Sequence, residues 1–148
     1  IVKNFLKNSN ATNFEVISDE NIKQNILSNS FFAVAKSGTI SLEICNAGIP
    51  SIIIYKMNFI NFFIIKMLVN KRIRFANIFN IISDSEIIPE LLQSRCNPNT
   101  IFSFFNKYIN NAELRKTQIM NCTKILNEMK TNISSTDKVA NIINASLN

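Results

Sequence analysis

Short apolar runs alternate with segments of helical periodicity over the first two thirds of the chain. The apolar runs are residues 14–17, 31–35 and 51–55, and they have the length of strands. Residues 19–27 and 39–47 place apolar side chains on one face at helical spacing, which predicts helices. Alternating strands and helices are typical of a parallel sheet wrapped by helices. We therefore expect an α/β fold in which residues 31–35 form a central strand buried on both faces.

The best-defined unit covers residues 31–55. Its first strand ends at the turn Ser37-Gly38-Thr39, and its helix ends just before Gly48, where a glycine is expected after a helix C-terminus. The second strand follows at once. Such a unit joins two parallel strands through a right-handed crossover.

Beyond residue 81 the periodicity predicts helices only, so that the chain ends in a helical cap on the α/β domain. Pro89 would lie near the beginning of the first of these helices, which suits the preference of proline for the first turn. The predicted helices are residues 85–93, 99–108, 112–130 and 137–147.

Residues 59–69 are almost continuously apolar and are followed by several cations. The run is too short to span a bilayer. It fits either a helix packed on the sheet or a helix lying in a membrane interface next to anionic lipid. In the second interpretation the residues in contact with the membrane would be Phe59, Phe62, Phe63, Lys66, Lys71 and Arg72.

Composition narrows the chemistry of this 148-residue chain, which has the size of one domain. There is no histidine, and Cys45, Cys96 and Cys122 lie far apart, which argues against a structural metal and against Cys/His catalysis. We expect neither a metal nor a cofactor. The net charge is +6, but the cations are not interleaved with stacking aromatics, so nucleic acid is not an expected partner. The chain is also rich in asparagine and isoleucine, which we attribute to AT-rich codons.

The turn Ser37-Gly38-Thr39 is a candidate phosphate site. A turn that opens a helix after a buried strand presents unpaired backbone N–H groups and the positive end of the helix dipole. Gly38 allows close approach of the backbone, and the two hydroxyls can donate to phosphate oxygens. The alternative is that Ser37 or Thr39 only caps the helix. A P-loop lysine and a G-x-G-x-x-G pattern are both absent from the sequence.

Four further polar residues are candidates for binding. Glu43 lies one helical turn beyond Thr39 and could accept two ribose hydroxyls, or it could be a solvated helix glutamate. Asn77, Glu90 and Gln93 are placed in loops or at a helix start. Glu90 could equally serve to complement a helix dipole.

Four blocks carry a resemblance to a known family. They are Ala-Lys-Ser-Gly-Thr-Ile-Ser-Leu-Glu at residues 35–43, Gly-Ile-Pro at 48–50, Tyr-Lys-Met at 55–57 and Pro-Glu-Leu-Leu-Gln at 89–93. In this order and spacing they resemble the C-terminal part of bacterial lipid-A-disaccharide synthases, which are glycosyltransferases of the GT-B type. The resemblance implies a Rossmann-like C-terminal domain, a parallel sheet with helices on both faces and a helical C-terminal cap.

The resemblance also implies an activity. The family transfers 2,3-diacylglucosamine from UDP-2,3-diacylglucosamine to the lipid acceptor 2,3-diacylglucosamine 1-phosphate, with inversion at the anomeric carbon. By similarity, Ser37, Gly38 and Thr39 would face the diphosphate and Glu43 the ribose. Asn77, Glu90 and Gln93 would lie toward the donor sugar, although Ala76 stands where the family usually has proline. The family works at the cytoplasmic face of the inner membrane of Gram-negative bacteria as a peripheral protein.

A GT-B transferase needs two domains, and residues 1–148 supply one partial donor-binding domain. The N-terminal acceptor domain is absent, and we expect the catalytic base, which remains unknown, to belong to it. The chain alone is therefore expected to be inactive without the missing domain or a separate chain that supplies it. A homodimer is a further candidate assembly. Two alternatives remain: a non-catalytic module that binds membrane surfaces, and another GT-B enzyme that uses a UDP-sugar.

Overall fold

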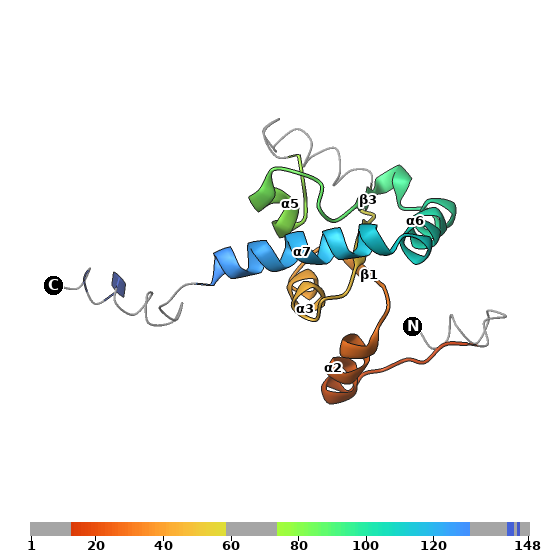
Figure 1. The fold of residues 1–148 in the computed structure, drawn as a ribbon, viewed down its shortest axis with the longest axis horizontal. Helices are drawn as coiled ribbons and strands as arrows, with labels where there is room; N and C mark the ends of the chain where they lie inside the picture. Colours follow the sequence, from red (N-terminus) through yellow and green to blue (C-terminus); the bar gives the residue numbers. More distant parts are fainter. Residues whose placement is uncertain (1–12, 59–73, 131–141, 144, 146–148) are drawn as a thin grey trace. The chain divides into compact units, whose positions relative to one another are not determined.

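The computed structural model describes residues 13–58, 74–130, 142, 143 and 145. The chain divides into two compact units, Ile1–Ser30 and Phe31–Asn148 (Figure 1). The membrane-facing candidates Phe59, Phe62, Phe63, Lys66, Lys71 and Arg72 lie outside the described residues, as does most of the helix predicted over residues 137–147.

The first unit contains helix α2 (Glu20–Asn29), which confirms the helix predicted over residues 19–27. The Asp19 side chain caps it by accepting hydrogen bonds from the backbone N–H groups of Asn21 at 2.8 Å and Ile22 at 3.2 Å. The strand predicted over residues 14–17 is wrong, because this segment has no regular secondary structure. A strand needs a neighbour for its backbone groups, and no described strand pairs with it.

The second unit contains a parallel sheet in the order β1 (Ala33–Lys36), β2 (Ser51–Tyr55) and β3 (Glu90–Leu92). The predicted parallel α/β arrangement is confirmed, with Val34 paired to Ile52 and Ile53 paired to Glu90. The prediction that residues 31–35 form the central strand is wrong. Among the described strands β1 has one neighbour and β2 has two, so Ile52 and Ile53 are fully buried and Val34 is 45% exposed.

Strand β3 stands where a helix was predicted over residues 85–93, so that prediction is also wrong. Residues 85–89 form an irregular connection, and the backbone N–H of Ile53 donates to the carbonyl of Pro89 at 2.9 Å, which draws the segment into the sheet. Pro89 thus precedes a strand and does not open a helix. The strand ends at a short 3-10 helix, η1 (Gln93–Arg95), whose first residue has a φ of +50°.

Helices flank the sheet, and α-helices follow its last strand in the sequence (Figure 1). Helices α3 (Ile40–Asn46), α6 (Pro98–Asn110) and α7 (Ala112–Met129) confirm three predicted helices. Helix α5 (Ile78–Ser83) was not predicted. Helix α7 contacts α3, α5 and α6, so it ties the helical layer together.

The starts of the last three helices have a common chemistry. Asn77, Asn97 and Asn111 each accept a backbone N–H from the first turn of α5, α6 and α7, respectively. An asparagine in this position satisfies one of the donors that a helix N-terminus leaves without an intrahelical acceptor.

The core lies where β2 and β3 meet α6. Ile52, Leu91 and Tyr108 form its buried centre. On the amino side of the sheet the buried Gln118 of α7 both donates to and accepts from the backbone of Ser51. No helix in the described ranges is long and apolar enough to cross a membrane.

The contact of α3 with α7 includes two buried thiols. A hydrogen bond between Cys45 and Cys122 raises the pKa of Cys45 and lowers that of Cys122. Cys122 is therefore the first of the two thiols to lose its proton as pH rises.

Candidate functional site

The candidate site begins at the turn that follows β1. The hydroxyl of Ser37 donates to the carbonyl of Ala76 at 2.9 Å, which joins two turns 39 residues apart in the chain. Gly38 has a φ of +152°, a conformation that side chains disfavour. A β-carbon added at Gly38 would meet no heavy atom of the described residues within 4 Å, so these residues leave the space beside the turn open.

The two hydroxyls of this turn do not serve as helix caps. Thr39 occupies the capping position of α3, but its side chain makes no capping hydrogen bond. Ser37 uses its hydroxyl on Ala76. The alternative that these residues only cap α3 is therefore wrong.

Ser41 is a site residue that the sequence analysis missed. Its side chain is 1% exposed, and its hydroxyl donates to the carbonyl of Gly38 at 2.7 Å. The Ser41 backbone N–H donates to the same carbonyl at 3.2 Å. This double contact holds the turn in shape. A serine two residues after a Ser-Gly-Thr turn was the only signal available in the sequence.

Glu43 lies in the first turn of α3, as its spacing predicted. Its backbone N–H donates to the carbonyl of Thr39 at 3.4 Å, and its side chain is half-buried. A half-buried carboxylate does not fit the alternative of a fully solvated helix glutamate. Helical spacing places the Glu43 side chain on the same side of α3 as the turn of residues 37–39.

Asn77 brings a second turn to the same edge of the sheet. It caps α5 by accepting the backbone N–H of Phe79 at 3.0 Å, and it is fully buried. Its Nδ2 atom is also buried and has no hydrogen-bond partner among the described residues. Because Ala76 accepts from Ser37, this amide lies close to the end of β1.

Glu90 is used inside the protein. It is 5% exposed, and its carboxylate accepts the backbone N–H groups of Ala76 at 2.8 Å and Asn77 at 2.9 Å. The carboxylate thus lies at the start of α5, where it complements the helix dipole. Contact with a donor sugar stays a prediction for this residue.

Gln93 is also engaged with the backbone. Its side chain accepts the Met57 N–H at 2.9 Å and donates to the Met57 carbonyl at 3.3 Å. Since Met57 follows β2 and Gln93 follows β3, this reciprocal pair links the carboxyl ends of two strands. Its role toward the sugar likewise stays a prediction.

Lys36 and Tyr55 end neighbouring strands at this edge. The ammonium group of Lys36 lies 5.0 Å from the centre of the Tyr55 ring, a cation–π contact. Both residues lie in the sequence motifs at residues 35–43 and 55–57, but neither was predicted to belong to the site. A lysine directly before a candidate phosphate turn was the signal that could have identified it.

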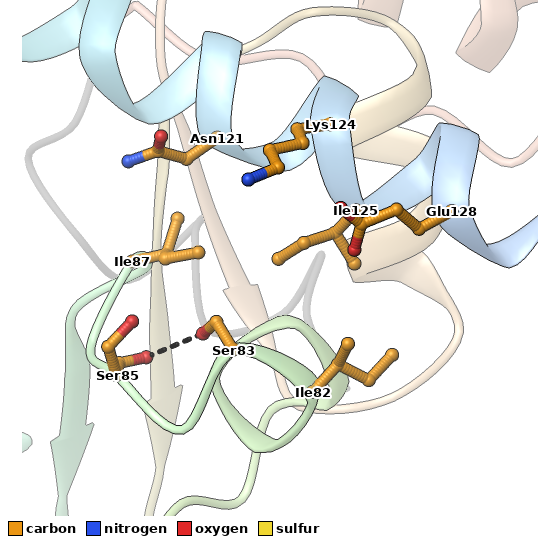
Figure 2. Close-up of a pocket in the computed structure, with 8 residues that line it drawn as sticks. All are labelled: Ile82, Ser83, Ser85, Ile87, Asn121, Lys124, Ile125 and Glu128. Atoms are coloured by element: carbon orange, nitrogen blue, oxygen red, sulfur yellow. Dashed lines mark hydrogen bonds between the residues drawn. The ribbon is translucent and has the colours of Figure 1, made fainter.

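The described residues hold no cluster of three His, Cys, Asp or Glu suited to a metal ion. They do contain a separate cavity of about 280 Å³ between helix α7 and the end of α5 (Figure 2). Ser83, one of its polar groups, already donates to backbone carbonyls, including that of Ser85 at 3.0 Å. None of the predicted site residues lines this cavity.

Comparison with known proteins shows which family this chain resembles in sequence. The family model described as lipid-A-disaccharide synthetase matches residues 2–143. The lipid-A-disaccharide synthase of Rickettsia prowazekii (strain Madrid E) is 38% identical over 129 residues, which cover 87% of this chain and 33% of that protein. The synthase of Sulfurihydrogenibium sp. (strain YO3AOP1) is 39% identical over 113 residues, covering 76% of this chain and 29% of that protein.

The chain spans about a third of the length of these relatives. The family match includes both turns of the candidate site, and it confirms the resemblance carried by the motifs at residues 35–43 and 89–93. The chain belongs to the lipid-A-disaccharide synthetase family.

Proposed function

We propose that this chain is the C-terminal, donor-binding part of a lipid-A-disaccharide synthase and that it binds UDP-2,3-diacylglucosamine at the turn of residues 37–39. The observation that carries the proposal is the hydrogen bond from Ser37 to Ala76, which brings an open glycine turn and a buried asparagine together at one sheet edge. Ligands of open parallel sheets bind outside the carboxyl ends of the strands.

Each residue of the site has a role in this proposal. The backbone of Gly38 and the hydroxyl of Thr39 contact the diphosphate of UDP, while Ser37 holds the turn in place through its hydrogen bond to Ala76. Glu43 accepts the two ribose hydroxyls, because a carboxylate offers two acceptor oxygens to a vicinal diol. The ammonium of Lys36 adds a positive charge beside the diphosphate.

The donor sugar then lies toward Asn77. Its buried Nδ2 atom is a donor for a sugar oxygen. Glu90 and Gln93 support this region by binding the backbone of Ala76, Asn77 and Met57.

The reaction is an inverting displacement. The acceptor hydroxyl attacks the anomeric carbon of the donor sugar, the bond from that carbon to the diphosphate oxygen breaks, and UDP leaves with the electron pair. Hydrogen-bond donors at residues 37–39 stabilise the negative charge that develops on the diphosphate. We infer that the base that takes the acceptor proton is not one of the residues assigned to the donor site.

The remaining partners follow from this assignment. We infer that a second domain, a separate chain or a second copy supplies the acceptor site. We also infer a peripheral location on the cytoplasmic face of the inner membrane. Phe59, Phe62, Phe63, Lys66, Lys71 and Arg72 are then the residues that touch anionic lipid.

Titration calorimetry of the full 148-residue chain with UDP tests the proposal. We expect micromolar to millimolar binding, which Glu43→Ala weakens by about tenfold or more through the loss of two hydrogen bonds. Thr39→Val should weaken it through the loss of one hydroxyl. The matched control is Glu113→Ala, because Glu113 is an exposed glutamate in the first turn of α7.

A folded chain that does not bind UDP would overturn the proposal, as would equal losses in the Glu43 and Glu113 variants. Binding to anionic vesicles without UDP binding would instead favour a membrane-surface module. Stronger binding of another nucleotide would favour a different GT-B enzyme.

A further inference from the structure

Asn80 of α5 is a fully buried asparagine whose side chain makes four hydrogen bonds. Its Oδ1 accepts the backbone N–H groups of Ile87 at 2.8 Å and Ile88 at 2.9 Å. Its Nδ2 donates to the Ile88 carbonyl at 2.7 Å and to Glu90 Oε1 at 2.8 Å. The amide thus uses its full hydrogen-bonding capacity inside the protein.

The bond from Asn80 to Glu90 is the first of a series. The same Glu90 carboxylate accepts the N–H groups of Ala76 and Asn77, and Ala76 in turn accepts the hydroxyl of Ser37. Buried hydrogen bonds of this kind are strong because little water competes with them. Asn80 is therefore connected to the candidate site through Glu90 and one turn of backbone.

We propose that Asn80 is a positioning residue for the nucleotide-sugar donor. Its amide orients the Glu90 carboxylate, which holds the Ala76–Asn77 turn against Ser37 and so places the buried Asn77 amide. This inference rests on the proposed function, because it assigns a role to Asn80 in binding the donor at that same site.

A purely structural Asn80 would have a different consequence. It would affect the folded fraction of the chain but not the affinity of the folded chain for UDP. A positioning residue changes the affinity itself, and it does so through the hydrogen bond to Glu90. The experiment must therefore switch that one bond on and off in a folded protein.

Asn80→Asp does this, since it keeps the side-chain shape and the oxygen that accepts from Ile87 and Ile88. It replaces the amide donor with a second carboxyl oxygen 2.8 Å from Glu90. Two carboxylates at this distance do not both ionise readily, so one proton is shared between them at low pH. A protonated Asn80→Asp side chain donates to Glu90 again, and an ionised one repels it.

The expected result is a pH-dependent affinity in the variant. Near pH 5, UDP should bind to Asn80→Asp within about threefold of the unaltered chain, and near pH 8 about tenfold or more weakly, as the shared proton is lost. The same measurements on the unaltered chain show how much of the change in UDP affinity comes from the titration of other groups. The charged groups around the network are Glu86 with Arg95, Asp84 with Arg74, and Lys124 and Glu128 of α7.

Two further variants complete the test. Gln118→Glu is the matched control, because it exchanges an amide for a carboxylate in a buried network at the amino end of β2. It should lower stability without a pH step in UDP affinity. Asn80→Ser shortens the side chain so that it no longer reaches Glu90, and it should weaken UDP binding by about tenfold at both pH values.

Each outcome decides one question. Absence of UDP binding by the unaltered chain contradicts the proposed function. Binding by that chain together with a pH-independent affinity in Asn80→Asp overturns the role of Asn80. Should Asn80→Asp not fold, as judged by circular dichroism, Asn80→Ser decides: UDP binding weakened about tenfold supports the role, and an unchanged affinity in the folded variant overturns it.

Discussion

At the residue scale, Tyr108 combines an apolar ring with a polar group that must stay satisfied. Its ring packs 5.1 Å from that of Phe32, and its hydroxyl accepts a hydrogen bond from Gln118 at 3.0 Å. Burial raises the pKa of Tyr108 to about 12, with smaller contributions from the negative charges of Cys122 and Glu86. The neutral phenol is therefore part of the folded structure.

This shift predicts a loss of stability at alkaline pH. Tyrosine in the unfolded chain ionises near pH 10, so the folded state binds the Tyr108 proton more tightly than the unfolded state. The stabilisation is complete below about pH 10 and is lost as pH rises through about 12, at a cost of about 2 to 3 kcal/mol. Urea unfolding between these values, compared with Tyr108→Phe, measures the effect.

The difference between the two proteins is the decisive quantity, since lysines titrate in both. The free energy of unfolding should fall more steeply with pH in the unaltered chain than in Tyr108→Phe. Parallel pH profiles would contradict the prediction.

At the element scale, Gln118 connects α7 to the beginning of β2. Its side chain accepts the Ser51 N–H at 2.7 Å and donates to the Ser51 carbonyl at 3.0 Å and the Ile87 carbonyl at 3.2 Å. At the beginning of β2 the backbone N–H and carbonyl of Ser51 have no partner in a neighbouring strand on the side that faces Gln118. The buried Gln118 amide satisfies both groups instead. The position of α7 on the sheet depends on this contact.

Replacing Gln118 by Met should therefore cost about 3 kcal/mol of unfolding free energy, since the shape is kept but the buried backbone groups of Ser51 lose their partner. Denaturant unfolding of the variant measures this cost. Lys116→Met, at an exposed position on the same helix, should change stability by less than about 0.5 kcal/mol. Equal effects of the two substitutions would show that the Gln118 contacts contribute nothing specific.

A helix or strand could be predicted where the residues that determine it are neighbours in the sequence. The unit from β1 to β2 was predicted because apolar runs, a turn and Gly48 lie next to one another in the sequence. Strand β3 was mistaken for a helix because its state depends on pairing with β2 and on the side chain of Asn80. Helix α5 was missed because its capping partner Glu90 lies 13 residues from Asn77.

The same reasoning applies to the candidate site. The relation of Glu43 to the turn of residues 37–39 was predictable, because helical spacing determines it. The bond from Ser37 to Ala76 was not, since it crosses 39 residues. Nor was the engagement of Glu90, which looked available for a ligand as long as its buried partners were unknown.

At the scale of the whole molecule, the chain covers about a third of its relatives, and β1 has a strand neighbour on one side only among the described strands. A parallel strand with an open edge is a place where further chain can pair. The donor site proposed above lies at the carboxyl edge of the same sheet, so the acceptor-binding part inferred above has to reach this edge.

We accordingly expect the chain alone to release no UDP from UDP-2,3-diacylglucosamine in the presence of the acceptor. Adding the preceding two thirds of a relative, such as the Rickettsia prowazekii protein, as a separate chain should restore release. A coupled assay for UDP measures both, with Glu43→Ala as the control that removes donor binding. UDP release by the chain without any addition would contradict this prediction.

The asparagine caps of α5, α6 and α7 also bear on how such a sequence evolves. Asparagine is as good a helix cap as serine or aspartate, so mutation toward AT-rich codons can replace those residues there at little cost. The caps Asn97 and Asn111 thus act as neutral sites for compositional drift, whereas the Asn77 amide also belongs to the proposed donor site. Asn80 is different, because both the oxygen and the NH2 group of its amide form buried hydrogen bonds. A lineage under this bias should exchange the caps of α6 and α7 more often than Asn77 or Asn80.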